Sequence, residues 1–302
     1  MNRRNFIQNT VLTSALAATN PIELFAENET KITILHTNDV HSHIEPFPSD
    51  HPRNANMGGV AKRAKLIQQI KAENPNVLLL DAGDSFQGTP YFNYFEGELE
   101  WKLMSQMGYH ATTIGNHEFD NGLTGILKPL EFAKFDLLSA NYDFSNTILE
   151  GRIKPYKIYQ IAGIKIGVFG LGVELQGLVD KRMYLETKYL DPVEISTDMV
   201  RILKDKHQCD VIICLSHLGF DYRNEPNKIS DKKLAQLTNG IDVIIGGHTH
   251  TFLEKPFIQK NKMDKEVMIN QVGAYGIYLG RIDLIFQKNK GVQTNTRVLQ
   301  VG

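Results

Sequence analysis

The sequence contains few cysteines. Only Cys209 and Cys214 occur among its 302 residues, so the composition is not that of a small disulfide-stabilised domain. The residues between them are typical of extended chain, which would place the two cysteines roughly 16 Å apart, far beyond disulfide reach. We expect two buried thiols beside or within a strand. Because a chain this long can bury a sizeable core, cysteine content says nothing about its compartment.

An excess of charge of one sign is also lacking. The 33 Lys and Arg residues are balanced by 34 Asp and Glu residues, for a formal net charge of -1. This balance provides no basic field for a nucleic-acid backbone or an anionic membrane, so we expect no nucleic-acid partner. Any phosphate group that binds must be met by local charge.

Long apolar runs, internal repeats and Pro-rich linkers are absent from the sequence. The run 11–18 is far shorter than the ~20 residues that a membrane-spanning helix needs, so no membrane span is expected. No composition shift marks a boundary after about residue 30. We therefore predict one large domain over residues 30–302.

The amino terminus has the composition of an export signal. Arg3 and Arg4 precede the short apolar run, the small residues Ala15 and Ala17 offer a cleavage site, and Ala26 is a second candidate. The paired arginines resemble a twin-arginine signal, although two arginines also suit an ordinary secretory signal. We expect residues 1–26 to be cleaved and the protein to be periplasmic or secreted, exported by the twin-arginine route.

The rest of the sequence alternates short apolar runs with amphipathic segments, which predicts strand-helix-strand units with parallel pairing. The strand-like runs are 32–35, 77–80, 111–114, 211–215 and 241–245, and the helix-like segments are 60–72, 96–107, 123–135, 192–207 and 231–237. Residues 156–161 and 164–170 flank a turn and suggest a hairpin, and only strand-like runs follow residue 252. We predict a mixed two-sheet sandwich with helices outside.

Each of the five strand-like runs is followed directly by side chains that bind metals. These residues are Asp39, His41, Asp84, Asn116, His217, His248 and His250. Because the carboxyl ends of parallel strands share one edge of a sheet, the five loops are expected to converge on one crevice. Two aspartates, one asparagine and four histidines are too many ligands for one ion and suit two.

We assign the ligands to two ions roughly 3.5 Å apart, bridged by Asp84. One ion takes Asp39, His41 and His250, and the other takes Asn116, His217 and His248. His248 and His250 would face the same side if that segment were extended. The imidazole-rich set disfavours calcium and leaves manganese, zinc or iron open. With a bridging hydroxide the centre keeps a charge near +1, which attracts a phosphate.

His117 follows a ligand directly but should face apart from it, toward a substrate. If a helical turn begins there, Asp120 can hydrogen-bond its ring, hold one tautomer and keep it protonated, which suits a general acid. We predict that His117 and Asp120 are catalytic and that Asn116 and His117 contact the substrate. Glu118 would face away from the ions and hydrogen-bond the loop backbone.

The motifs resemble those of the calcineurin-like metallophosphoesterases. The matching segments are Asp39-Val-His41, Gly83-Asp84, Gly115-Asn116-His117-Glu118, Ser216-His217 and Gly247-His248-Thr-His250. Their longer forms are similar to the amino-terminal catalytic domain of bacterial 5'-nucleotidases and UDP-sugar hydrolases, over roughly residues 30–290. The resemblance implies a four-layer αββα sandwich of two mixed sheets flanked by helices, the two-metal site and the His117–Asp120 pair. Those nucleotidases carry a further carboxy-terminal domain that holds the nucleoside, whereas this sequence ends at Gly302.

We therefore expect an exported two-metal phosphoesterase that hydrolyses phosphate monoesters, above all 5'-nucleotides, by in-line attack of a metal-bridging hydroxide with His117 assisting the leaving group. Alternatives are a cyclic-nucleotide phosphodiesterase, a UDP-sugar pyrophosphatase, a related two-metal hydrolase of sulfur oxidation, and a non-catalytic metal-binding module. No base-binding surface is identifiable in the sequence. We expect weak discrimination among substrates, or a separate polypeptide that supplies the nucleoside pocket.

Other residues receive structural interpretations. His36, His43 and His51 are candidates for the pocket mouth, whereas His110 and His207 are expected to serve packing or to lie on the surface. Trp101 is predicted to be a core residue. The basic cluster Lys62, Arg63 and Lys65 lies in a helix-like segment, and its default interpretation is a solvated face.

Overall fold

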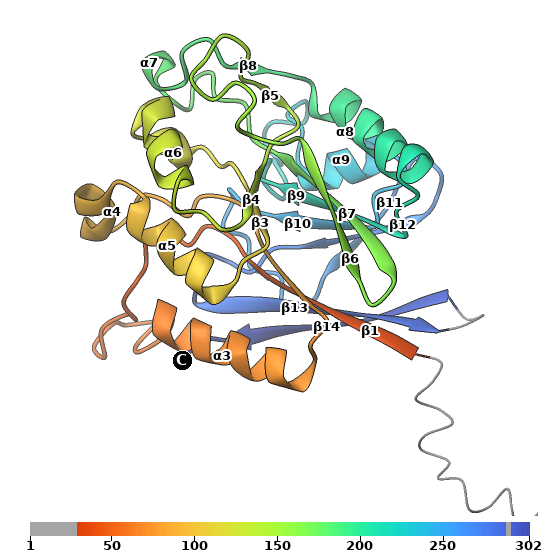
Figure 1. Cartoon of the computed structure of the whole chain (residues 1–302), viewed down its shortest axis with the longest axis horizontal. Coiled ribbons are helices and arrows are strands. Elements are labelled where there is room, and N and C mark those ends of the chain that lie inside the picture. Colours follow the sequence, from red (N-terminus) through yellow and green to blue (C-terminus); the bar gives the residue numbers. More distant parts are fainter. Residues whose placement is uncertain (1–28, 288–290) are drawn as a thin grey trace, which may run out of the picture.

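A computed structural model describes residues 29–287 and 291–302 (Figure 1). The helices in these ranges are α3 (Val60–Glu73), α4 (Pro90–Phe95), α5 (Glu98–Met107), α6 (Gly122–Leu130), α7 (Lys181–Tyr184), α8 (Pro192–Arg201) and α9 (Asp231–Leu237), with the 3-10 helix η1 (His117–Phe119) and the π-helical turn η2 (Ile202–Lys206). The strands are β1 (Glu29–Thr37), β2 (Val77–Asp81), β3 (Ala111–Thr113), β4 (Asp136–Leu138), β5 (Tyr142–Asp143), β6 (Tyr156–Ile161), β7 (Ile164–Leu171), β8 (Lys188–Tyr189), β9 (Val211–Ser216), β10 (Val243–Gly246), β11 (Phe257–Lys260), β12 (Glu266–Asn270), β13 (Tyr278–Gln287) and β14 (Gly291–Gln300).

Two six-stranded mixed sheets form the centre of the protein. The first has the order β14-β13-β1-β2-β3-β4 and the second β11-β12-β10-β9-β7-β6. Strands β1 to β4 run parallel, as do β7, β9, β10 and β12, whereas β13, β14, β6 and β11 pair antiparallel to their neighbours. Short strands β5 and β8 form a separate pair. The first sheet therefore has antiparallel strands at one edge only, whereas the second has a parallel centre with an antiparallel strand at each edge.

The central strands β2, β9 and β10 are largely apolar because both of their faces are buried. In β2, Leu78 and Leu80 belong to the core between the two sheets, whereas Leu79 belongs to the outer core with α3 and α5. In β9, Ile213 belongs to the core between the two sheets, whereas Ile212 belongs to the outer core near α8 and α9. Alternate residues of these strands thus face the core between the sheets and the core beneath the helices. Helices cover the outer face of each sheet, which gives four layers.

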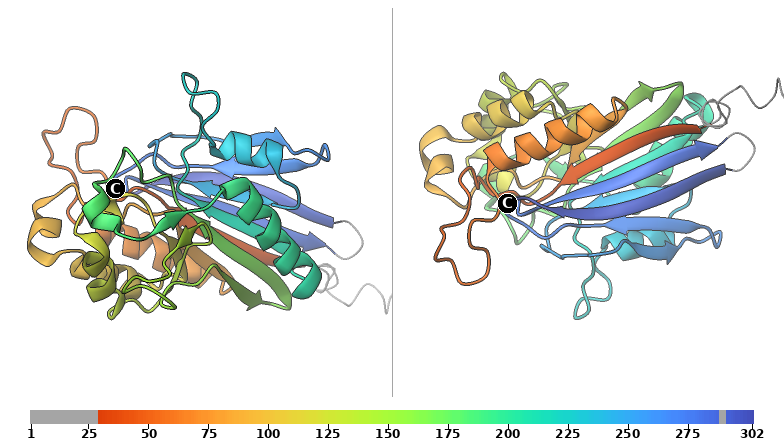
Figure 2. Two further views of the ribbon diagram at one scale, coloured as in Figure 1. Left: turned by 90° about the horizontal axis from the view of Figure 1, so that it is seen from above. Right: turned by 90° about the horizontal axis from the view of Figure 1, so that it is seen from below.

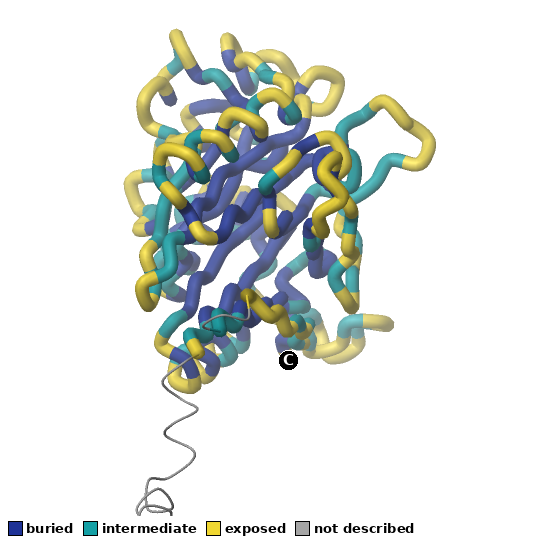
Figure 3. Tube along the Cα trace, turned by 90° about the vertical axis from the view of Figure 1, so that its right-hand side faces the viewer, coloured by how far each residue is buried: buried dark blue, intermediate teal, exposed yellow. Residues whose placement is uncertain are grey.

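The figures show this layering. In Figure 1, α3 lies on one side of the strands, and α8 and α9 lie on the opposite side. The view from below in Figure 2 shows α3 against the sheet that contains β1, β13 and β14. In Figure 3 the strands form a continuous buried interior, and exposed residues gather in the loops and on the outer faces of the helices. The predicted four-layer sandwich is confirmed.

The boundaries of the helices were predicted less accurately than the positions of the strands. The segment expected as one helix over 96–107 begins at Glu98, after a separate helix α4 and a left-handed Gly97. The helix expected over 123–135 ends at Leu130, directly after Pro129. The helix expected over 192–207 changes to a π-helical turn after Arg201. The predicted hairpin is present as β6 and β7.

Several smaller expectations can also be compared with the fold. Cys209 and Cys214 are buried free thiols, and Trp101 is a fully buried core residue, as predicted. None of the helices in the described ranges is long and apolar enough to cross a bilayer. The predicted export signal lies outside the described residues.

Candidate metal centre

The predicted ligands gather in one crevice, but they reach it from both sheets. The loops after β1, β2 and β3 belong to the first sheet, and the loops after β9 and β10 belong to the second. The expectation that all five share one sheet edge is therefore wrong, because the crevice forms where the carboxyl edges of two stacked sheets meet. The cavity has a volume of about 590 Å³, and its lining includes His41, Asp84, Asn116, His117, His248 and His250. Asp39 and His217 lie beneath it, with no exposed surface.

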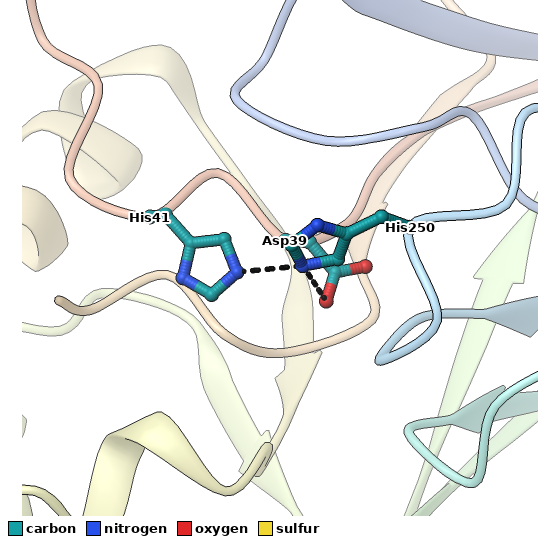
Figure 4. Close-up of side chains that lie close together, drawn as sticks. All are labelled: Asp39, His41 and His250. Carbon is teal, nitrogen blue, oxygen red and sulfur yellow. Dashed lines mark hydrogen bonds and ion pairs between the residues drawn. The ribbon is translucent and has the colours of Figure 1, made fainter. Parts of the chain in front are cut away.

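Asp39, His41 and His250 form one group of ligand atoms (Figure 4). The Nε2 atoms of His41 and His250 face each other at 2.9 Å, and His250 Nε2 lies 3.5 Å from Asp39 Oδ1. Asp39 is held in place by the side-chain amide of Asn38, which donates to its Oδ2 at 2.6 Å. These are the three residues that the sequence assigns to one ion.

A second group contains Asp84, His217 and His248. His217 Nε2 lies 2.9 Å from Asp84 Oδ2 and 3.9 Å from Asp39 Oδ1, and it is fully buried. His248 Nδ1 lies 2.8 Å from the side-chain oxygen of Asn116, which brings Asn116 to the same group. Asp84 also lies 4.0 Å from His41 Nε2, so it reaches both groups. This is the position required of a bridging ligand.

The electrostatics of these groups fit divalent cations. Burial lowers the pKa of His41 to about 4 and that of His248 to about 3, so both imidazoles are neutral and can offer lone pairs. Burial also lowers the pKa of His217, but the charge of Asp84 outweighs it and raises that pKa to about 10. Burial raises the pKa of Asp39 to about 8, so a positive charge beside this carboxyl would favour its ionised form. Imidazole and carboxylate donors of this kind bind divalent transition metals.

The ligand loops have strained backbones. Asp39, His41, Asp84, His248 and His250 all have positive φ angles, between 49° and 73°. Non-glycine residues rarely adopt this conformation, and each instance costs on the order of 1–3 kcal/mol. The expectation that His248 and His250 share a side because their segment is extended is therefore wrong. Their side chains converge through a left-handed loop.

A glycine beside one of these ligands permits the close approach. A Cβ atom on Gly115 would lie 2.1 Å from Asp84 Oδ1, so any other residue there would push the loop after β3 away from the loop after β2.

His117 lies beside the ligands and pairs with Asp120. Its Nδ1 lies 2.9 Å from Asp120 Oδ2, across the 3-10 turn η1. Burial lowers the pKa of His117, but the hydrogen bond that its ring donates to Asp120 and the charge of Asp84 outweigh it and raise the pKa above its usual value. Because Nδ1 is engaged by Asp120, Nε2 is the nitrogen that can carry a proton toward a substrate.

Glu118 hydrogen-bonds the loop backbone, as predicted from the sequence. Its Oε1 accepts hydrogen bonds from the N–H and hydroxyl of Ser85, at 2.8 and 2.9 Å. Its Oε2 accepts from the N–H groups of Asp84 and Gly115, at 3.0 and 2.7 Å. Glu118 therefore ties the loops after β2 and β3 together from behind the ligands.

We expect Glu118→Gln to destabilise the fold by about 2–4 kcal/mol. The new amide nitrogen would face backbone or hydroxyl donors with a donor of its own, leaving buried groups unsatisfied. Urea unfolding of the purified protein measures the change. Glu131→Gln, at an exposed position, is the matched control and should unfold like the unchanged chain. Identical unfolding midpoints for Glu118→Gln and the control would show that these hydrogen bonds contribute little.

Two of the minor sequence interpretations are wrong. Arg63 is 2% exposed rather than solvated, because it lies on the inward face of α3 with Val60, Ile67 and Ile70. His36 is fully buried in β1 and does not reach the pocket mouth.

Of the remaining histidines, His43, His110 and His207 behave as expected, whereas His51 packs against the ring of Phe47 and is not among the residues that line the cavity. His43 lines the cavity. His110 Nδ1 accepts the backbone N–H of Leu79, and His207 packs against Tyr156, so both serve packing.

Sequence analysis missed the aromatic side chains at the cavity mouth. Phe47 and Tyr275 line the same cavity as the predicted ligands, and the ring of His43 lies between them. No motif marks these residues, and Tyr275 is far along the chain from Phe47. Phe47 has one weak sequence signal, since it is an aromatic residue a few positions after His41, and Tyr275 has none.

Comparison with known proteins identifies the class of the chain. Residues 32–252 match the family model described as calcineurin-like phosphoesterase. The chain therefore belongs to this family, which places it among the metal-dependent hydrolases of phosphate esters. The resemblance inferred from the motifs is confirmed at this level.

Individual relatives point to one branch of the family. The snake venom 5'-nucleotidase of Gloydius brevicauda is 38% identical over 283 residues, covering 87% of this chain and 46% of that protein. The structure of a 5'-nucleotidase precursor from Thermus thermophilus matches with a TM-score of 0.81 and 33% identity, over 90% of this chain and 55% of that one. An NAD nucleotidase from Haemophilus influenzae matches with a TM-score of 0.77 and 29% identity, over 91% and 51%. The chain spans about half the length of these relatives.

Proposed function

We propose that this chain hydrolyses phosphate monoesters, and that 5'-nucleotides are its principal substrates. The observation that carries the proposal is the pair of ligand groups joined by Asp84, with the His117–Asp120 pair on the same cavity. A metal-binding module without catalytic activity would not need His117 to be oriented by Asp120, because neither residue is required to hold the ions. The 5'-nucleotidase relatives support the nucleotide as the natural ester.

Each residue has a defined part in the reaction. Asp39, His41 and His250 would hold one divalent ion, and Asn116, His217 and His248 the other, with Asp84 shared. Two ions bound there would neutralise phosphate charge and lower the pKa of a water molecule. Manganese, zinc and iron all suit these donors.

His117 acts on the leaving group. The water molecule releases a proton to solvent, a bond forms between its oxygen and phosphorus, and the bond from phosphorus to the ester oxygen breaks. His117 Nε2 gives its proton to that departing oxygen, which leaves as the alcohol. Asp120 holds the ring in the required tautomer through Nδ1, and Asn116 and His117 contact the phosphate oxygens.

The proposal is tested by a panel of substrates across added metals. After removal of metal by chelation and dialysis, each of manganese, zinc and iron is added back, and hydrolysis of AMP, a cyclic nucleotide and a UDP-sugar is measured. We expect AMP to be the best of the three substrates, with no turnover before metal is restored. Turnover that is unaffected by chelation would refute the metal-dependent mechanism.

A second candidate activity is cleavage of a pyrophosphate bond in a dinucleotide or nucleotide sugar. The structural similarity to an NAD nucleotidase favours it. The side chains lining the cavity that can carry positive charge are histidines, so a second phosphate would rely on the same ions as the first. We therefore rank it below the monoesterase. A higher kcat/KM for the UDP-sugar than for AMP would reverse the order.

We also propose that residues 30–302 form a single catalytic domain and that residues 1–26 direct export by the twin-arginine route to the periplasm or beyond. The support is the paired arginines followed by a short apolar run. Replacing both Arg3 and Arg4 by lysine should leave the protein in the cytoplasm of an expressing bacterium, detected by cell fractionation. Unchanged export would assign the signal to the general secretory route.

A further inference from the structure

The cavity has an aromatic wall beside the ligand groups, which we define as His43, Phe47 and Tyr275. The rings of His43 and Phe47 stack with centroids 5.1 Å apart and an interplanar angle of 28°. The ring of Tyr275 lies 4.6 Å from that of His43 and 6.1 Å from that of Phe47. All three side chains remain partly exposed, so the wall presents ring surface to the cavity.

The wall is continuous with the ligands. The ring of Tyr275 lies 5.7 Å from that of His250 and 6.0 Å from that of His41, whereas the ring of His41 lies 5.1 Å from that of His117. A phosphate bound among these histidines would therefore have its ester group within reach of the wall. Leu178, which is 48% exposed, adds apolar surface to the same cavity.

The backbone fixes the wall in position relative to the ligands. The N–H of Tyr275 donates to the carbonyl oxygen of Asp39 at 2.7 Å, and Tyr275 has a positive φ of 63°. His43 Nδ1 lies 2.9 Å from the carbonyl oxygen of His41. Two of the three wall residues are thus hydrogen-bonded to the backbone of ligand residues. A strained residue that places a ring beside a site indicates a functional constraint.

We propose that the aromatic wall is a binding subsite for the planar ring of an aromatic phosphate ester, either a nucleobase or an aryl group. The proposal rests on the proposed phosphomonoesterase function and names its preferred substrate class. Exposed aromatic side chains bind planar groups by stacking, and this interaction tolerates different rings because each has a π-face. The chain itself would then favour aromatic over aliphatic esters, contrary to the sequence-based expectation that no such surface exists.

The kinetic test uses Phe47→Leu, which keeps apolar volume without a π-face, and Tyr275→Asn, because asparagine tolerates a left-handed backbone. We expect kcat/KM for AMP and nitrophenyl phosphate to fall about tenfold in each variant, and that for glycerol phosphate to change less than about twofold. Tyr94→Leu, at an 81% exposed position outside the cavity, is the control and should change none of the three.

Each outcome bears on the proposal. Loss for AMP and nitrophenyl phosphate together supports a general ring subsite, and loss for AMP alone supports a nucleobase subsite. Equal losses for all three esters, or no loss for any, would overturn the proposal.

A second measurement does not depend on hydrolysis. Saturation-transfer NMR of adenosine with the metal-depleted chain should show transfer to the adenine protons, and Phe47→Leu should weaken it. If no ester were hydrolysed but adenosine still bound, the proposed function would fail and the subsite would stand. Absence of adenosine transfer to the unchanged chain would refute the subsite alone.

Discussion

Asp84→Ala is expected to abolish turnover, by roughly four orders of magnitude or more, and to lower bound metal from two equivalents to one or none. Asp84 reaches both ligand groups, at 2.9 Å from His217 Nε2 and 4.0 Å from His41 Nε2. Removing it deletes a ligand from each proposed ion. It also removes the negative charge that would offset the repulsion between the two cations. Its Oδ1 also accepts the backbone N–H of His117, so the variant loosens the catalytic turn.

Elemental analysis of the purified variant measures metal content beside activity. Asp84→Asn keeps the shape and one carbonyl oxygen, so it separates loss of charge from loss of packing. Asp81→Asn is the control, because Asp81 is buried at the end of β2, the strand before Asp84, but belongs to neither ligand group. Two full equivalents of metal in Asp84→Ala would show that Asp84 does not bridge the ions.

His117→Asn is expected to lower turnover of alkyl phosphates by about two to four orders of magnitude while metal content stays unchanged. The imidazole would no longer supply a proton to the departing oxygen, whereas the ligand groups remain complete. An acidic phenol needs little protonation to leave, so nitrophenyl phosphate should lose much less.

The comparison of esters distinguishes two roles for His117. A smaller loss for the nitrophenyl ester identifies a general acid, and equal losses would make His117 an electrostatic stabiliser of the phosphate instead. His207→Asn, which alters a histidine packed against Tyr156 away from the cavity, serves as the control. A drop in metal content in His117→Asn would place this residue among the ligands, where its distance to His41 and Asp84 would also allow it.

The strands and the ligand residues were predictable because their signals are local. A strand buried on both faces favours apolar residues along its whole length, and the runs that became β1, β2, β3, β9 and β10 are mostly buried and rich in Val, Ile, Leu or Ala. A metal ligand must have an oxygen or nitrogen atom with a free lone pair. Asp39, Asp84 and the histidines are therefore recognisable as candidate ligands directly after the apolar runs. Helix ends were less predictable, since tertiary packing competes with local preference.

Arg63 shows where local reasoning fails. Three basic residues in a helix suggest a solvated face, yet Arg63 occupies the inward stripe of α3. A Cβ on Gly276 would come within 2 Å of its guanidinium, so the space for this group is provided by a residue more than 200 positions away in the chain. No window of sequence contains that information.

By itself, the sequence determined the identity and order of the ligand side chains, the strands that precede them and the His117–Asp120 pair, because each depends on residues close together in the chain. Only the tertiary structure decided that loops from two sheets meet in one crevice, that five ligands adopt left-handed backbones, and that Phe47 and Tyr275 share a wall. These features arise from contacts between distant segments. Packing of the two sheets supplies the free energy that holds the strained loops in place.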